Sequence, residues 1–99
     1  MKEIIDRELL NKIIQINGRD AQIEMIQEEC IELALALQKC KRKDINDIDK
    51  LISVYDEIAD VIIMIEQAKI LFNQDIINKR IRYKLNRMKR IIIENNENC

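Results

Sequence analysis

The chain has 99 residues, of which 47% are hydrophobic and 35% charged, and its net charge is −1. This length and balance fit one globular domain over residues 1–99, with no overall charge that would attract nucleic acid or a membrane. Histidine is absent, which excludes Ser-His-Asp and Cys-His catalysis and zinc sites that use imidazole. Proline is absent and glycine occurs once, so a sheet-rich fold with many tight turns is disfavoured.

The cysteines and the first residues of the chain indicate a cytoplasmic protein. Three cysteines without a C-x-x-C spacing fit free thiols in a reducing compartment. The first residues are too acidic, and their apolar run is too short, for a signal peptide. No uncharged run approaches the roughly 20 residues that a membrane span needs. We therefore expect neither a membrane nor a nucleic acid as a partner.

The first half of the chain predicts two helices, because its apolar residues recur at three- and four-residue spacing. The first is expected over Lys2–Asn17 and ends before Gly18, since glycine adopts positive φ without penalty. The second is expected over Asp20–Lys41, where Cys30 falls in the apolar stripe and is interpreted as a small core residue, not a nucleophile. The connecting loop is expected over Lys43–Asp47.

The second half predicts two longer helices. Asn46 or Asp47 would cap a helix over Ile48–Leu71, whose apolar residues cover two sides, as in a central helix or one at a subunit interface. Asn73 would cap a fourth helix over Gln74–Asn95, and the polar residues 94–99 would fray. The residues of this fourth helix that we expect to face inward are Ile77, Ile81, Leu85, Met88 and Ile92. The prediction is an all-α four-helix bundle whose burial is completed by oligomerisation.

Two acidic pairs border the apolar stripes of the middle helices. Glu29 and Glu32 lie three residues apart in one helix, and Glu57 and Asp60 lie three apart in the next, so each pair shares a face. Asp60 also interrupts the apolar run 58–65. Desolvating such carboxylates together is costly without a counter-ion, and neither motif has a base close by in its helix. A hard divalent cation, Mg²⁺ above all, fits this pattern; a solvated acidic face is the alternative interpretation.

The order Glu28-Glu29-x-x-Glu32, a gap of 24 residues, then Glu57-x-x-Asp60 resembles the signature of the MazG-like all-α nucleoside triphosphate pyrophosphohydrolases. The likeness covers about residues 20–90, most of the chain. It implies hydrolysis between the α and β phosphates, which gives a nucleoside monophosphate and pyrophosphate, in many relatives for nucleotide-pool sanitation. It also implies dependence on Mg²⁺ or Mn²⁺ and assembly into dimers or tetramers with sites near subunit contacts.

The resemblance also implies roles for individual residues. The four metal ligands would be Glu29, Glu32, Glu57 and Asp60. Glu28 would stand behind a ligand or orient the attacking water. The general base stays unassigned.

Residues 79–90 hold seven basic side chains and no acid. A solvated cationic face is one interpretation, and a surface that binds the triphosphate is the other. In helical projection Lys84 lies closest to the apolar stripe, so we expect Lys84 and Arg87 to bind phosphate, with Arg82 and Asn86 as alternatives.

The residues that would contact the base are less defined. Gln22 precedes the first motif and is a candidate for binding substrate, together with Asn11 and Gln15. Tyr55 and Phe72 are aromatic but occupy core-like positions. Two other functions stay open: a non-catalytic helical interaction module, and a phosphoribosyl-ATP pyrophosphohydrolase with the same type of reaction.

Overall fold

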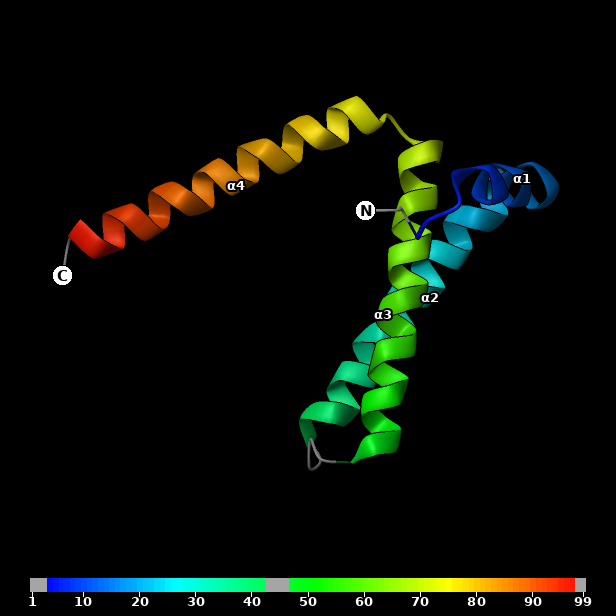
Figure 1. Ribbon diagram of the computed structural model, residues 1–99, viewed down its shortest axis with the longest axis horizontal. Helices are drawn as coiled ribbons and strands as arrows, with labels where there is room; N and C mark the ends of the chain where they lie inside the picture. Colours follow the sequence, from blue (N-terminus) through cyan, green and yellow to red (C-terminus); the bar gives the residue numbers. More distant parts are fainter. Residues whose placement is uncertain (1–3, 43–46, 98–99) are drawn as a thin grey trace.

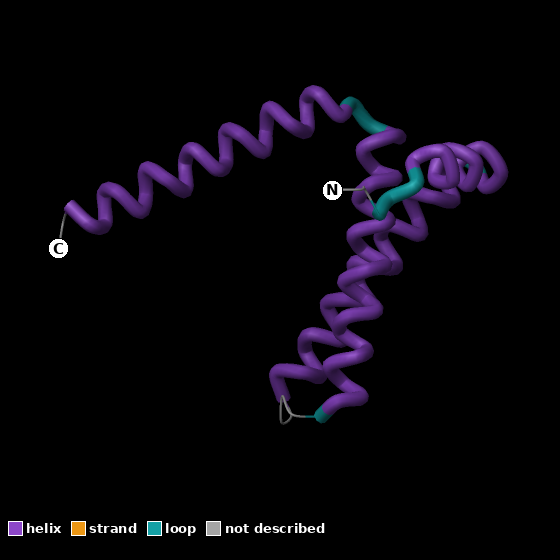
Figure 2. The backbone as a smooth tube through the Cα atoms, viewed as in Figure 1, coloured by secondary structure: helices purple, strands orange, loops and turns teal. Residues whose placement is uncertain are grey.

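The computed structural model describes residues 4–42 and 47–97, which form four α-helices (Figure 1). The helices are α1 (Arg7–Asn17), α2 (Arg19–Arg42), α3 (Ile48–Leu71) and α4 (Gln74–Glu97). Within those ranges there is no strand, so the predicted all-α class is confirmed (Figure 2). No helix of the described residues is both long and apolar enough to cross a membrane.

Side-chain and glycine caps set both ends of α1. The Asp6 carboxylate accepts a hydrogen bond from the Leu9 amide at 3.1 Å, and the helix therefore begins at Arg7. The predicted start at Lys2 was wrong, because apolar spacing continues through residues that the cap leaves outside the helix. The end was predicted correctly: Gly18 follows the helix with a φ of 89°, a value that strains any residue with a Cβ.

The other helix boundaries agree closely with expectation. The Asp47 carboxylate caps α3 by accepting from the Lys50 amide at 3.4 Å. Asn73 caps α4 through its side-chain oxygen, which accepts from the Ile76 amide at 3.1 Å. The alternative cap, Asn46, lies outside the described residues, as do the other loop positions 43–45 and the last two residues. Residues 94–97, which we expected to fray, belong to the last turn of α4.

The core lies where α2 and α3 run side by side in opposite directions and α1 crosses the end of the pair (Figure 1). Among the described residues, the buried hydrophobic side chains are Leu10, Val54 and Met64, each at 5–7% exposure. Two glutamines are buried with them, Gln22 at 0% and Gln67 at 1% exposure. So small an apolar core supplies little stability to a single chain.

A buried chain of amide hydrogen bonds joins the first three helices. Gln22 Nε2 donates to Gln67 Oε1 at 2.6 Å, which links α2 to α3. Gln22 Oε1 accepts from Asn17 Nδ2 at 2.9 Å, which links α2 to the end of α1. Because buried amides are costly when unpaired, these bonds fix how the three helices meet.

The fourth helix leaves the end of α3 and extends away from the other three (Figure 1). The radius of gyration is 17.4 Å, compared with about 13 Å for a compact chain of this size. The expected packing of α4 within its own chain was therefore wrong: Ile77 is only half-buried, and Ile81, Leu85, Met88 and Ile92 are exposed. Helical periodicity identifies a face that favours burial, but it does not say which surface buries it.

Three further side chains expected in the core are exposed. Tyr55 is 63% and Phe72 47% exposed, and Cys30 is also exposed. The cause is the same in each case, because α2 covers one side of α3 only and α4 covers neither helix along its length. The single chain leaves these side chains largely open to solvent, although the Arg19 guanidinium lies 5.7 Å from the centre of the Phe72 ring.

Candidate metal centre

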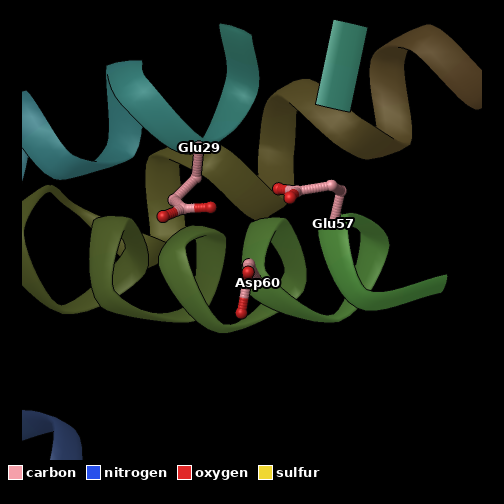
Figure 3. A group of neighbouring side chains, drawn as sticks. All are labelled: Glu29, Glu57 and Asp60. Carbon is pink, nitrogen blue, oxygen red and sulfur yellow. The ribbon is translucent and has the colours of Figure 1, made fainter. Parts of the chain in front are cut away.

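The pairing of α2 with α3 brings Glu29, Glu57 and Asp60 together in one carboxylate cluster (Figure 3). One carboxylate oxygen from each residue lies within 4.8 Å of the other two. Glu29 extends from α2 toward α3, while Glu57 and Asp60 come from one face of α3, since they are three residues apart. Three of the four predicted metal ligands are thus neighbours in space although they come from two helices.

Two oxygens of the cluster are buried and have no hydrogen-bond partner. They are Glu29 Oε2 and Glu57 Oε2. Both side chains are half-buried, whereas Asp60 is exposed, so the cluster is closed toward the helix pair and open on one side. A buried carboxylate oxygen without a donor is unfavourable, and native proteins rarely leave one so. The pair therefore marks a place where a cation or a proton is needed.

Burial and mutual repulsion both disfavour the ionised state of these carboxyl groups. Removal from water is the largest cause that raises the pKa of Glu29 above its usual value, and the charge of Asp60 is the next. Removal from water is also the largest cause that raises the pKa of Glu57, followed by the charges of Glu32 and Asp60. When Glu29 is protonated it donates a hydrogen bond to the Glu57 carboxylate, which raises the pKa of Glu29 and lowers that of Glu57. The cluster thus holds more negative charge than its surroundings stabilise.

No basic side chain neutralises the cluster in the part of the chain that the structure describes. The ion pairs there are Arg7–Glu66 at 3.5 Å, Lys69–Glu66 at 3.2 Å and Arg19–Asp20 at 3.4 Å. None of them includes Glu29, Glu57 or Asp60. Within the described residues, therefore, no ion pair compensates the charge of these carboxylates, and a bound cation or proton would do so.

The donor set suits a hard cation. Mg²⁺ takes six oxygen ligands at about 2.1 Å and usually keeps several waters, which places neighbouring ligand oxygens roughly 3–4 Å apart. Carboxylate oxygens within 4.8 Å of one another need only modest side-chain adjustment to reach that spacing. The residues present therefore fit Mg²⁺ or Mn²⁺, and the open side beside Asp60 leaves room for water and for ligand oxygens.

The remaining acidic residues of the motif lie around the cluster. Glu32 is exposed and does not join the three-residue group, yet its charge raises the pKa of both Glu29 and Glu57. Glu32 therefore lies at the rim of the site, near enough for its charge to repel the charges of Glu29 and Glu57. Glu28 is exposed on α2, and as the residue next to Glu29 it points about 100° away around the helix.

The predicted substrate-binding residues are not brought to the cluster within one chain. Gln22 is fully enclosed and both ends of its amide are already hydrogen-bonded, so it is not presented to a ligand. Lys84 and Arg87 are exposed on α4, the helix that extends away from α2 and α3. The alternatives Arg82 and Asn86 are also exposed on α4.

Sequence reasoning missed Gln67, the buried partner of Gln22. Asp60 interrupts an apolar run, but Gln67 follows Glu66 and precedes Lys69 by two residues, so its surroundings in the sequence give no such signal. A buried polar side chain must find a partner inside the fold. At Gln67 the partner is an amide, whereas at Asp60 the neighbours are two more carboxylates.

The chain matches no protein-family profile, no curated protein and no solved structure. The geometry of the carboxylate cluster and the spacing of its residues are therefore the basis for proposing a function.

Proposed function

We propose that the protein is a Mg²⁺-dependent hydrolase that cleaves a nucleoside triphosphate between the α and β phosphates. The products are the nucleoside monophosphate and pyrophosphate, and Mn²⁺ is the alternative cation. The observation that carries the proposal is the pair of buried, unpartnered oxygens on Glu29 and Glu57, two residues that form one carboxylate cluster with Asp60. The resemblance of the two acidic motifs to those of MazG-like pyrophosphohydrolases supports the substrate and the bond that is cleaved.

In this reaction the acidic residues of the chain would have separate roles. Glu29, Glu57 and Asp60 would hold the cation, and the closed side of the cluster would limit its contact with bulk water. When bound, Mg²⁺ would neutralise charge on the phosphate oxygens and lower the pKa of a coordinated water. The exposed carboxylate of Glu32 would orient the attacking water from the rim by accepting its hydrogen bonds. Glu28 points away around α2, so the role that the resemblance gives it is not part of this proposal.

The proposal extends to the setting of the enzyme. We expect a cytoplasmic homodimer or homotetramer that removes nucleotides from the cellular pool and binds no nucleic acid. The basic residues Lys84 and Arg87 would bind the triphosphate in the assembled protein, since cationic side chains favour phosphate oxygens. The related alternative substrate is phosphoribosyl-ATP, because its hydrolysis requires the same groups.

Product analysis tests the reaction directly. Ribo- and deoxyribonucleoside triphosphates are incubated with Mg²⁺ and the wild-type protein, Glu57→Gln, or Glu24→Gln as a matched control. Glu24 is an exposed acid on α2 outside the cluster. We expect monophosphate and pyrophosphate from the wild type and the control, and loss of both in Glu57→Gln. A diphosphate with orthophosphate, or equal turnover in Glu57→Gln, would refute the proposal.

The exposed apolar surface favours a second candidate, a helical module that binds another protein without catalysis. Thermal unfolding with Mg²⁺ and a non-hydrolysable nucleotide separates the two functions. Ligand at a hundred times its dissociation constant stabilises the native state by about 2.7 kcal/mol. The hydrolase requires this rise in melting temperature, whereas the interaction module shows none.

A further inference from the structure

The fourth helix has an apolar stripe without a partner. Every residue of α4 from Lys79 to Glu97 is exposed. The helix contacts α3, and its first residue, Gln74, accepts a hydrogen bond from Arg7 of α1 at 3.2 Å. The stripe, which we call the α4 stripe, consists of Ile81, Leu85, Met88 and Ile92. These residues follow one another at four- and three-residue spacing and so lie along one face of the helix. A helix of 24 residues gains most of its stability in water from packing such a face.

The third helix carries a matching apolar surface. Its side toward α2 holds the buried residues Val54, Met64 and Gln67. The opposite side is exposed, and we call it the outer face of α3; it consists of Ile48, Ile52, Tyr55, Ile58, Ile62 and Ile65. It spans about 26 Å of helix at 1.5 Å per residue, which is long enough for the α4 stripe at about 17 Å.

The accessible surface of the chain is too large for a compact monomer. It is 8378 Å², whereas a folded monomer of 11.8 kDa exposes roughly 5,900 Å². The excess of about 2,500 Å² is well above the roughly 800 Å² that each partner buries in a stable interface. A partner with a large apolar surface is therefore needed to bring the exposed area into the usual range.

The charges of the two helices are complementary. Residues 74–97 of α4 include seven basic and three acidic side chains, and residues 48–71 of α3 include five acidic and two basic ones. A like helix, α3 against α3 or α4 against α4, would meet the same sign of charge. Glu57 and Asp60 belong to the carboxylate cluster, and Glu66 is paired with Arg7 and Lys69, so the charge difference belongs to the helices as wholes. It disfavours α4 against α4 and is compatible with α4 against α3.

The α4 helix of the same chain does not cover the outer face of α3. A two-residue turn, Phe72 and Asn73, joins the two helices, and from there α4 runs away from α3 (Figure 1). We propose that α4 of a second copy packs along the outer face of α3, and that the two copies exchange their α4 helices in a symmetric dimer. Such a contact is self-complementary, because each copy provides one stripe and one face.

This dimer does not depend on the proposed catalytic function. Glu57 lies on the side of α3 that faces α2, away from the outer face. Substitutions on the outer face or on the α4 stripe therefore leave the carboxylate cluster in place. Loss of association and loss of metal-dependent activity can be measured as separate results.

Sedimentation equilibrium tests the α4 stripe. The double variant Leu85→Lys, Met88→Lys is compared with Tyr83→Lys, Ile93→Lys, which changes two exposed apolar residues of α4 outside the stripe by the same charge. We expect dimers for the wild type and the control and a monomer for the stripe variant. A monomeric wild type, or a dimeric stripe variant, would overturn the proposal. Far-UV circular dichroism verifies that each protein is helical.

Mixing two variants tests which surfaces meet. The variant Ile52→Glu, Tyr55→Glu changes the outer face of α3, and we expect it to be monomeric alone. Mixed with the Leu85→Lys, Met88→Lys variant, it should form a dimer with one unaltered contact and one that pairs Glu with Lys. If the α3 variant stays dimeric alone, α4 packs on α4 and the proposal fails. It also fails if the mixture stays monomeric.

Discussion

Glu29 and Glu57 destabilise the protein without a cation and would stabilise it when a cation is bound. Each has a buried oxygen that receives no hydrogen bond, and no ion pair of the described residues offsets their charge. In the metal-free protein the two carboxyl groups repel each other and favour protonation. With a divalent cation the same crowding becomes the binding site, because the charge that destabilised the fold now attracts the ion.

The substitution Glu57→Gln separates these two states. It removes one charge from the cluster and keeps the size of the side chain, so we expect the melting temperature of the metal-free protein to rise. The rise produced by Mg²⁺ should disappear, and pyrophosphate release should fall about a hundredfold or more. Differential scanning calorimetry with and without Mg²⁺ measures the stability effects. If Glu57→Gln responds to Mg²⁺ as Glu24→Gln does, Glu57 is not a ligand.

The raised pKa of Glu29 gives a second prediction at this scale. The ordinary value is 4.5 and the folded value is higher, so between them the folded protein binds more protons than the unfolded chain. Stability without metal therefore falls as pH rises from 4.5 through the raised pKa, and then stays level for this group. Urea unfolding in chelator should show this decline in the wild type and a weaker one in Glu29→Gln. Equal slopes would contradict the shifted pKa.

At the scale of secondary-structure elements, the sequence correctly predicted where a helix begins when a clear capping residue precedes it. Asp47 and Asn73 each combine a short polar acceptor with an apolar run that follows, and both cap the expected helix. The start of α1 was missed, because Ile5 continues the apolar spacing and hides the cap at Asp6. The placement of α4 could not be derived, since its stripe fits an interface as well as a core.

Part of the candidate site followed from spacing alone. Positions three apart share a helix face, so Glu57 and Asp60 were expected together, and the helix pairing adds Glu29. The sequence of neither helix determines the register in which α2 packs on α3. We therefore expected Glu32 in the cluster together with Glu29, whereas the structure places only Glu29 there. Gln22 was noted in the sequence as a polar residue near the first motif, but its hydrogen bond to the buried Gln67 could not be predicted.

The amide link between α2 and α3 carries a prediction of its own. Gln22→Met keeps the volume but leaves the buried amide of Gln67 without its donor, and we expect a loss of about 1–3 kcal/mol in unfolding free energy. The double variant Gln22→Met, Gln67→Met should lose less than the sum of the two single variants, because both polar groups are removed. Urea denaturation of the wild type, the two single variants and the double variant measures the four unfolding free energies of this double-mutant cycle. A raised KM with unchanged stability would instead indicate that Gln22 contacts substrate.

At the scale of the whole molecule, one chain is an incomplete folding unit. Its principal extents are 55 × 39 × 30 Å, and few of the described hydrophobic side chains are buried. A domain of about 100 residues depends on burying most of its apolar surface, since its conformational entropy cost is nearly as large as its gains. Association would supply the missing burial, so folding and assembly should be coupled.

Coupled folding makes the melting temperature depend on protein concentration. For a dimer that unfolds to two chains, a tenfold increase in concentration adds about 1.4 kcal/mol to the stability of the assembly. For an assembly of this size the melting temperature should then rise by roughly 3–5 °C. Calorimetry over a hundredfold range should show this rise in the wild type and in Tyr83→Lys, Ile93→Lys. The Leu85→Lys, Met88→Lys variant should melt lower and independently of concentration, and a constant wild-type value would mean that the single chain folds alone.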